Sequence, residues 1–221
     1  MSESETQLFI IGAGGHGSEL YSYASAMPNV HFAGFVDDNK PAGTEGGIHI
    51  VGGFDQMRSI VENQPATEFR YITAAGNNAV RRTIVDRIEQ FELANLSPWV
   101  LRDPSADIGR NVDIGDGTCL APHSIITTNT RIGKHCIVNI KASVSHDCLV
   151  GPFSNINPGA TICGSVTLGQ HSYIGAGSTI IEQITIGDNV IVGAGAVVIR
   201  DVPSNVTVAG VPATVIKGRA V

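Results

Sequence analysis

The sequence predicts an α/β domain followed by a coil of short parallel strands. Two observations predict this arrangement: a strand, glycine-rich turn and helix near the N-terminus, and an aliphatic residue at every sixth position from Ile108 to Val198. The 221 residues suffice for two such units, and a hydrophobic content of 43% supports a folded core. Charged residues make up only 15%, which argues against a helical bundle.

Composition also disfavours several classes of protein. The net charge of −6 is the opposite of what a nucleic-acid-binding surface needs. No run approaches the ~18 apolar residues of a membrane span. Segment 1–7 is polar and acidic, unlike a secretory signal, so we expect a cytoplasmic protein. No CxxC pair occurs, and we expect reduced, buried thiols at all four cysteines, which are Cys119, Cys136, Cys148 and Cys163.

The first hundred residues predict a glycine-rich turn at the start of a helix. An apolar strand at 8–11 precedes Gly12-Ala13-Gly14-Gly15-His16-Gly17, and a helix is expected over about 18–26. The spacing of Gly12, Gly14 and Gly17 satisfies G-x-G-x-x-G, which lets backbone N–H groups approach phosphate.

Two further strands bring polar residues to the same edge of the sheet. A strand at 32–36 ends in Asp37 and Asp38, which can bind a ribose hydroxyl or a base N–H. A strand at 69–74 leads into Gly76-Asn77-Asn78 and a third helix. Only about half of a full dinucleotide-binding domain is present. A nucleotide-linked sugar therefore fits better than NAD, and a purely structural turn stays open as an alternative.

From residue 104 the chain contains an internal repeat of six residues without insertion. We place the domain boundary between Asp103 and Pro104, so the units are 1–103 and 104–221. Sixteen consecutive positions carry Leu, Ile or Val. They are Ile108, Ile114, Leu120, Ile126, Ile132, Val138, Val144, Val150, Ile156, Ile162, Leu168, Ile174, Ile180, Ile186, Val192 and Val198.

A period of six fits neither a helix nor an alternating strand. It predicts a triangular coil in which each of three sides buries one aliphatic residue, so that 18 residues complete a turn. Neighbouring turns then pair as parallel strands about 4.8 Å apart. Glycine often follows the aliphatic residue, as at Gly133 and Gly151, and is expected to form a tight corner.

This repeat resembles the hexapeptide-repeat acyltransferases. The resemblance implies a left-handed parallel β-helix after the half-Rossmann α/β domain, and assembly as a homotrimer. The segment Val208-Ala209-Gly210-Val211-Pro212-Ala213 resembles the part that closes the helix in these enzymes. Thr214 stands where many members have a cation, and Lys217 or Arg219 could serve nearby.

The combination of Gly-Gly-His-Gly, Asp-Asp, Gly-Asn-Asn and a hexapeptide β-helix resembles the NeuD/PglD-type bacterial sugar acetyltransferases. One branch N-acetylates nucleotide-linked 4-amino sugars, and another O-acetylates sialic acids. We expect the N-acetylating activity. The expected substrate-binding residues are Gly14, Gly15, His16, Gly17, Asp37, Asp38, Asn77 and Asn139.

His146 is the candidate general base. It precedes Asp147, which can orient it, and imidazole can accept a proton at cellular pH. The resemblance implies the same role for the His of this pair. Gly164 lies 18 residues further on, so we expect its backbone N–H one turn away as an oxyanion donor.

Acetyl-CoA is the expected co-substrate, bound along the later turns between two subunits. The expected residues, which follow from small side chains and the resemblance, are Asn155, Asn157, Gly164, Ile174, Gly175, Ala176, Gly193 and Ala194. Ordinary tight corners, or an asparagine ladder through Asn139 and Asn157, would explain several of them equally well.

Two other classes are weighed against this one. A zinc enzyme of the γ-carbonic anhydrase type needs three histidines. His135 and His171 share a column but lie two turns apart, roughly 9.6 Å, and Ala176 stands where a third His is expected, so we predict no metal. A nucleotide-sugar sensor without catalysis is the second alternative, against which the His146-Asp147 pair argues.

Overall fold

The computed structural model describes residues 6–28, 30–45 and 48–218. Two compact units, Met1–Trp99 and Val100–Val221, are present. The division lies between Trp99 and Val100 rather than after Asp103, because β7 (Leu101–Arg102) already pairs with β10 (Cys119–Leu120) in the coil. Segment 1–5 and Arg219 lie outside the described residues.

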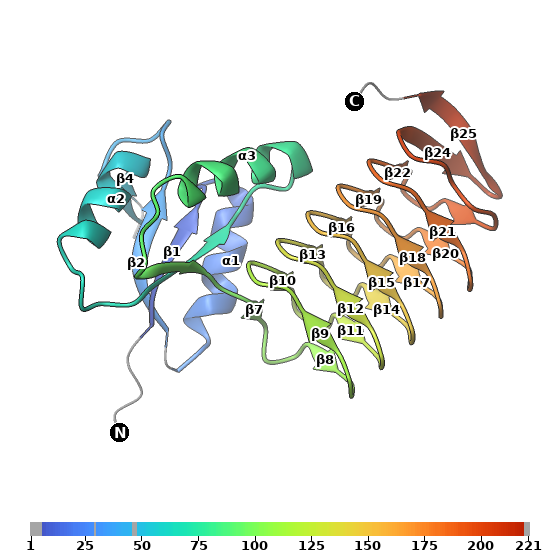
Figure 1. Cartoon of the computed structure of the whole chain (residues 1–221), viewed down its shortest axis with the longest axis horizontal. Coiled ribbons are helices and arrows are strands. Elements are labelled where there is room, and N and C mark those ends of the chain that lie inside the picture. The colour runs from blue at the N-terminus through green and yellow to red at the C-terminus, as the bar shows by residue number, and fades with distance from the viewer. Residues whose placement is uncertain (1–5, 29, 46–47, 219–221) are drawn as a thin grey trace. The chain divides into compact units, whose positions relative to one another are not determined.

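The first unit is a six-stranded sheet with three helices (Figure 1). Its strand order is β3-β4-β2-β1-β5-β6, parallel except for the β3–β4 pair. The elements are β1 (Thr6–Ile11), α1 (Gly15–Ser25), β2 (Val30–Val36), β3 (Gly43–Glu45), β4 (Ile48–Gly52), α2 (Phe54–Glu62), β5 (Phe69–Thr73), α3 (Asn78–Glu89) and β6 (Leu96–Pro98).

Strand β1 is central because both of its faces are apolar, and its last four residues are almost completely buried. On one side of the sheet, Phe9 stacks on Phe69 at 5.3 Å, and Met57 of α2 is fully buried in the same cluster. This packing fixes the carboxyl ends of β1, β2 and β5 at one edge, where the expected substrate residues follow.

Helix α1 begins at Gly15, three residues earlier than expected. Gly14 takes the N-cap position with an extended backbone, and the Ser18 N–H donates to its carbonyl at 3.0 Å. His16 and Gly17 therefore belong to the first helical turn rather than to the loop. The expected helix start was wrong because glycine is a poor helix former and only tertiary packing sets this boundary.

The second unit is the predicted parallel β-helix (Figure 1). Residues 18 apart pair throughout: Val144 of β14 (Ser143–Val144) pairs with Ile162 of β17 (Thr161–Ile162). The remaining strands are β8 (Asp107–Ile108), β9 (Asp113–Ile114), β11 (Ile125–Ile126), β12 (Arg131–Ile132), β13 (Ile137–Val138), β15 (Leu149–Val150), β16 (Asn155–Ile156), β18 (Thr167–Leu168), β19 (Tyr173–Ile174), β20 (Thr179–Ile180), β21 (Thr185–Ile186), β22 (Ile191–Val192) and β23 (Val197–Val198).

The core of this unit consists of the predicted aliphatic positions. From Leu120 onward all are buried, while Ile108 and Ile114 in the first turn are only partly buried. Small side chains such as Ala142 and Ser178 lie two residues before the aliphatic position and are also buried. Each turn thus packs its aliphatic residues on those of its neighbours.

The corners differ from the expectation. The left-handed backbone occurs three residues after each aliphatic residue, and one corner column carries Asn111, Asn129, Asp147, Ser165 and Gln183, all with φ between 53° and 62°. The glycine directly after the aliphatic residue does not need a positive φ at the positions predicted to be corners. It is instead required because the next turn passes too closely for a side chain.

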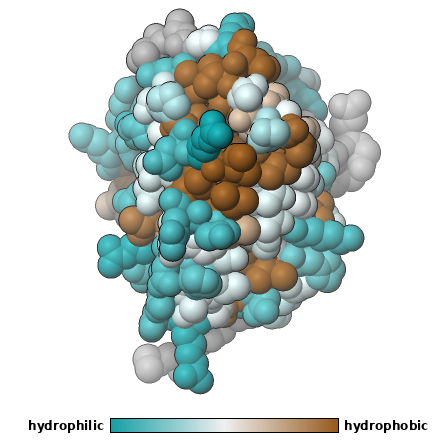
Figure 2. All heavy atoms as spheres, turned by 90° about the vertical axis from the view of Figure 1, so that its right-hand side faces the viewer, coloured by the Kyte–Doolittle hydropathy of each residue, from teal (hydrophilic) through white to brown (hydrophobic). Residues whose placement is uncertain are grey.

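A hairpin of β24 (Val206–Gly210) and β25 (Ala213–Gly218) closes the coil, with β24 parallel to β22. Figure 2 shows apolar side chains gathered on this end of the chain, where Val211, Val215 and Ile216 are exposed. None of the described helices is both long and apolar enough to cross a membrane.

Replacing Gly133 by Ala should destabilise the second unit. A Cβ there would lie 2.6 Å from the backbone N and 2.8 Å from the Cα of Pro152, and backbone atoms cannot turn away as a flexible side chain can. We expect the free energy of unfolding to fall by about 1–3 kcal/mol, measured as a lower urea midpoint.

Gly218→Ala is the matched control, since a Cβ there meets nothing within 4 Å. Its free energy of unfolding should stay within about 0.5 kcal/mol of the original. Equal midpoints for the two variants would show that close approach of the turns does not explain these glycines.

Candidate functional site

His146 and Asp147 form a pair at one corner of the β-helix. His146 follows β14, and Asp147 takes the left-handed corner position with φ of 59°. The Asp147 N–H donates to the Thr128 carbonyl in the preceding turn at 3.1 Å. Both side chains reach solvent, with 59% of His146 and 52% of Asp147 exposed in the single chain.

The Asp147 carboxylate orients the imidazole. His146 Nδ1 lies 2.8 Å from Asp147 Oδ2. The hydrogen bond from His146, and secondarily one from Asn129, lowers the pKa of Asp147 below its ordinary value of 3.8. An ionised carboxylate only accepts, so Nδ1 carries the proton and Nε2 keeps its lone pair. This tautomer leaves Nε2 free to accept a proton.

Gly164 lies against the same imidazole, one turn further on. A Cβ at Gly164 would lie 2.5 Å from His146 Cε1 and 2.6 Å from His146 Nε2, so only glycine fits beneath the ring. The Ser165 N–H donates to the His146 carbonyl at 2.9 Å and fixes the two turns together. Within the described part of the chain the Gly164 N–H has no hydrogen-bond acceptor.

The neighbouring cysteines do not form a nucleophile. Cys148 is buried, its thiol donates to the Cys163 carbonyl at 3.2 Å, and burial raises its pKa. A neutral buried thiol is a poor nucleophile. Cys119 and Cys136 are also buried, whereas Cys163 is only partly so.

The asparagines behave as individual backbone partners rather than as a ladder. Asn139 Oδ1 accepts from the N–H of Ile140 at 2.7 Å, and Asn157 Nδ2 donates to the Ile174 carbonyl at 2.6 Å. Asn139 is partly exposed, Asn157 is 9% exposed and Asn155 only 2%. Asn139 is therefore the most accessible of the three in the single chain.

The expected acetyl-CoA residues of the later turns divide into two kinds. Ile174 is fully buried in the core, so only its backbone is available to a ligand. Ala176 and Ala194 stack 18 residues apart and are exposed, with Gly175 and Gly193 directly before them. On β25, Thr214 and Lys217 are exposed.

In the first unit, the glycine-rich turn brings β1 and α1 close together. Gly12 has φ of +111°, a conformation that favours glycine. A Cβ on Gly17 would lie 2.1 Å from the Gly12 carbonyl oxygen. Around Gly14 and Gly15 there is open space within 4 Å, so a ligand can approach the start of α1.

His16 presents an unsatisfied nitrogen at this turn. Its Nδ1 lies 3.2 Å from Glu19 Oε2, and 23% of its side chain is exposed. The Nε2 atom is buried and has no hydrogen-bond partner among the described residues. A buried nitrogen without a partner is costly, which favours a ligand hydroxyl or phosphate oxygen here.

The acidic pair after β2 already serves the fold. Asp37 Oδ2 accepts from the Ala13 N–H at 3.0 Å, and Lys40 Nζ donates to the Ala13 carbonyl at 2.6 Å. Both contacts brace the glycine-rich turn. Sequence reasoning missed Lys40, for which no motif gave a signal.

Asp38 caps helix α2. Its Oδ1 accepts from the Phe54 N–H at 3.1 Å, and its Oδ2 pairs with Arg87, whose guanidinium lies over the Phe54 ring. A nucleotide contact from Asp38 would therefore have to share a carboxylate that already has two partners.

The loop after β5 is held from within. Asn77 Oδ1 accepts from the Val80 N–H at 3.1 Å and caps α3. The almost completely buried Arg81 donates to the Ala75 carbonyl at 2.6 Å. Arg81 was expected only as a helix residue, but it ties the loop to α3 and so positions Asn77.

The histidines considered for a zinc site are separated by a phenyl ring. Phe153 stacks on His135 at 5.1 Å and on His171 at 5.2 Å, at the third corner of the coil. The two imidazoles therefore cannot share one ion. No cluster of three or more His, Cys, Asp or Glu side chains able to hold a metal occurs among the described residues.

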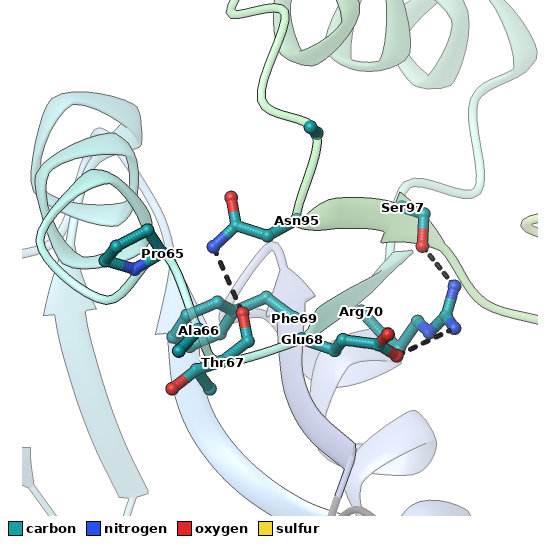
Figure 3. Close-up of a pocket in the computed structure, with 9 residues that line it drawn as sticks. Pro65, Ala66, Thr67, Glu68, Phe69, Arg70, Asn95 and Ser97 are labelled. Carbon is teal, nitrogen blue, oxygen red and sulfur yellow. Dashed lines mark hydrogen bonds and ion pairs between the residues drawn. The ribbon is translucent and has the colours of Figure 1, made fainter.

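A shallow pocket of about 530 Å³ lies at the opposite edge of the first sheet (Figure 3). It is lined by residues at the start of β5 and β6, among them Arg70 and Ser97, which hydrogen-bond to each other. Asn95 Nδ2 donates to the carbonyls of Val61, Gln64 and Thr67 and holds the surrounding loop. No expected site residue lines this pocket.

Comparisons with known proteins identify both units. The sequence model of the PglD N-terminal domain matches residues 7–88. The model of the bacterial transferase hexapeptide, six repeats, matches residues 165–200.

Solved structures match along almost the whole chain. The acetyltransferase domain of PglB from Neisseria gonorrhoeae FA1090 is 33% identical, with 95% of this chain and 99% of that chain covered and a TM-score of 0.84. A variant of perosamine N-acetyltransferase from Caulobacter crescentus, in complex with CoA and GDP-perosamine, is 29% identical, with 96% and 97% covered and a TM-score of 0.87.

The curated GDP-perosamine N-acetyltransferase of Escherichia coli O157:H7 is 28% identical over 154 residues, which are 67% of this chain and 66% of that enzyme. The match to the Neisseria domain covers both units at 33% identity, and the predicted α/β domain and β-helix are confirmed. The chain thus belongs to the NeuD/PglD-type sugar acetyltransferases, in which an α/β domain precedes a left-handed β-helix of hexapeptide repeats.

Proposed function

We propose that this protein transfers the acetyl group of acetyl-CoA to the C4 amino group of a nucleotide-linked 4-amino-4,6-dideoxy sugar, in the biosynthesis of a bacterial surface glycan. The observation that carries the proposal is the His146–Asp147 pair above Gly164. The similar Caulobacter and Escherichia coli enzymes are N-acetyltransferases of perosamine or GDP-perosamine, which supports an amine acceptor.

In the proposed reaction, His146 Nε2 takes the proton of the attacking amine while Asp147 holds Nδ1. The Gly164 N–H, which has no acceptor among the described residues, donates to the oxygen that becomes negative as the amine adds to the thioester. The carbon–sulfur bond then breaks, and the thiolate leaves and takes up a proton. Direct transfer fits the site, since Cys148 is a buried neutral thiol.

The acceptor is proposed to bind the α/β domain and the β-helix residue Asn139. The open start of α1 at Gly14 and Gly15 and the unpartnered Nε2 of His16 support phosphate and sugar contacts. Asp37, Asp38 and Asn77 are proposed to contact the nucleotide.

Acetyl-CoA is proposed to lie along Asn155, Asn157, Gly164, Ile174, Gly175, Ala176, Gly193 and Ala194. Because Asn155 and Ile174 are buried, their part in this would be through the backbone or by supporting neighbouring residues. We further propose a cytoplasmic homotrimer with its sites between subunits. Exposed aliphatic side chains on the flat faces, such as Ile125 and Leu149, support association.

The acceptor class is tested by thiol release from acetyl-CoA with a panel of UDP-, GDP- and dTDP-linked 4-amino-4,6-dideoxy sugars and free sialic acid. We expect release with one of the amino sugars, because the nucleophile must be a neutral amine near His146. Release with sialic acid alone would instead indicate O-acetylation. Binding of nucleotide sugars without any release would indicate a sensor.

His146→Asn should abolish the base and leave the fold intact. Asparagine fits the space but cannot accept the proton, so we expect kcat to fall by about 10²–10⁴-fold, measured as thiol release. Sedimentation equilibrium should give the same assembly as the original protein, and calorimetric CoA affinity should be unchanged. Turnover within a few-fold of the original would remove His146 from the mechanism.

Gly164→Ala tests the closeness of the oxyanion donor and the base. The added Cβ would lie 2.5 Å from the His146 ring, which is exposed and can swing away without disturbing the core. We expect about a 10²-fold lower kcat from the displaced imidazole, with an unchanged thermal midpoint. A lower midpoint with normal kcat would show that Gly164 serves only the packing of the coil.

A further inference from the structure

A short chain of hydrogen bonds runs along the catalytic corner of the β-helix toward Asp147. Asn111 Nδ2 donates to Asn129 Oδ1 at 3.1 Å, and Asn129 Nδ2 donates to Asp147 Oδ1 at 3.2 Å. These residues are 18 apart, so they occupy the same corner in three successive turns. Asp147 ends the chain and contacts His146.

The direction of this chain is fixed by its last member. An ionised carboxylate only accepts, so the side chain at position 129 must offer it a donor. The Oδ1 atom of Asn129 is already taken by Asn111, and rotating the amide would place oxygen against oxygen at both ends. Position 129 has φ of 53°, which asparagine tolerates better than most residues.

The two oxygens of Asp147 have different partners. Oδ1 accepts from Asn129, and Oδ2 accepts from His146 Nδ1. The hydrogen bond from His146, followed by that from Asn129, lowers the pKa of Asp147 from its ordinary 3.8. The charged pair is therefore fully formed above that value and is lost only as the pH falls through the lower pKa of the folded protein.

We propose that Asn129 is a positioning residue for the acetyl transfer. By holding Oδ1 it fixes the rotamer of Asp147, and Oδ2 then keeps the proton of His146 on Nδ1, with Nε2 beside Gly164. This inference rests on the proposed function, in which Nε2 is the base. Asn129 contacts neither substrate and acts only through Asp147.

The same residue type in another corner provides a matched comparison. Asn189 also has a left-handed backbone, with φ of 55°, and donates to Asn205 Oδ1 at 2.9 Å in the following turn. It lies in the corner column of Phe153 and His171, away from the His146 pair. A purely structural role for corner asparagines predicts the same behaviour for Asn129 and Asn189.

The test compares Asn129→Gly and Asn129→Asp with Asn189→Gly in the full-length protein. Glycine accepts the positive φ without strain, so it removes only the side chain. Carbon-13 NMR of Asp147 and long-range proton–nitrogen spectra of the His146 ring need no substrate. We expect the pKa of Asp147 to rise in both Asn129 variants and the Nδ1–H tautomer to lose population, whereas Asn189→Gly changes neither. An unchanged carboxyl titration and tautomer in the Asn129 variants would overturn the proposal.

Kinetics of thiol release provide the second readout. We expect Asn129→Gly to lower kcat by about tenfold, a fraction of the 10²–10⁴ supplied by a general base, with the KM of each substrate within about twofold. An equal loss in Asn189→Gly, or a changed KM with normal kcat, would overturn the positioning role. If the original protein shows no transfer at all, the proposed function fails, while the NMR comparison still decides whether Asn129 orients the pair.

Discussion

The pairing of each residue with the one 18 positions later determines where every functional group of the β-helix lies. Val144 pairs with Ile162, and the same register holds along all three sheets. Register is strongly specified because a slip of one residue would turn the buried aliphatic side chains outward. His146 and Gly164 are therefore neighbours as a consequence of core packing two residues earlier in each turn, and not through any local preference of their own.

The corners convert this regularity into a site. Each corner repeats the same backbone conformation, so side chains placed there stack directly above one another. At one corner this gives the stacked rings of His135, Phe153 and His171, and at another the polar run from Asn129 to Asp147. The backbone is common to both corners, so chemical differences arise only from which side chains occupy them. A catalytic pair can thus occupy a corner without any change in the architecture around it.

The sequence allowed the β-helix to be predicted well because its signal is periodic. The positions from Leu120 to Val198, the 18-residue turn and the closeness of His146 and Gly164 all follow from counting. The role of the glycine after each aliphatic residue could not be counted out, since it depends on how closely the Pro152 backbone passes Gly133. Asn129 was missed, although the same 18-residue step that gave Gly164 leads back to it from Asp147.

The α/β domain was less predictable because its polar residues have partners distant in sequence. Asp38 is 49 residues from Arg87, and Asp37 is 24 residues from Ala13. A motif shows that acidic side chains follow a strand, but it does not show that the fold itself uses them. The start of α1 at Gly15 likewise depends on tight packing of Gly17 against Gly12, a tertiary effect that overrides the low helix propensity of glycine.

The exposure of the His146–Asp147 pair sets a further physical requirement. Both side chains are more than half exposed in the single chain, and in water a contact of 2.8 Å between them contributes little. Stabilising the charge that develops during acyl transfer is most effective where water is excluded. One chain supplies the base, its carboxylate and the Gly164 N–H, but no wall over this corner. The proposed sites between subunits meet this requirement, because a second β-helix or a bound substrate would cover the pair and strengthen each of its hydrogen bonds.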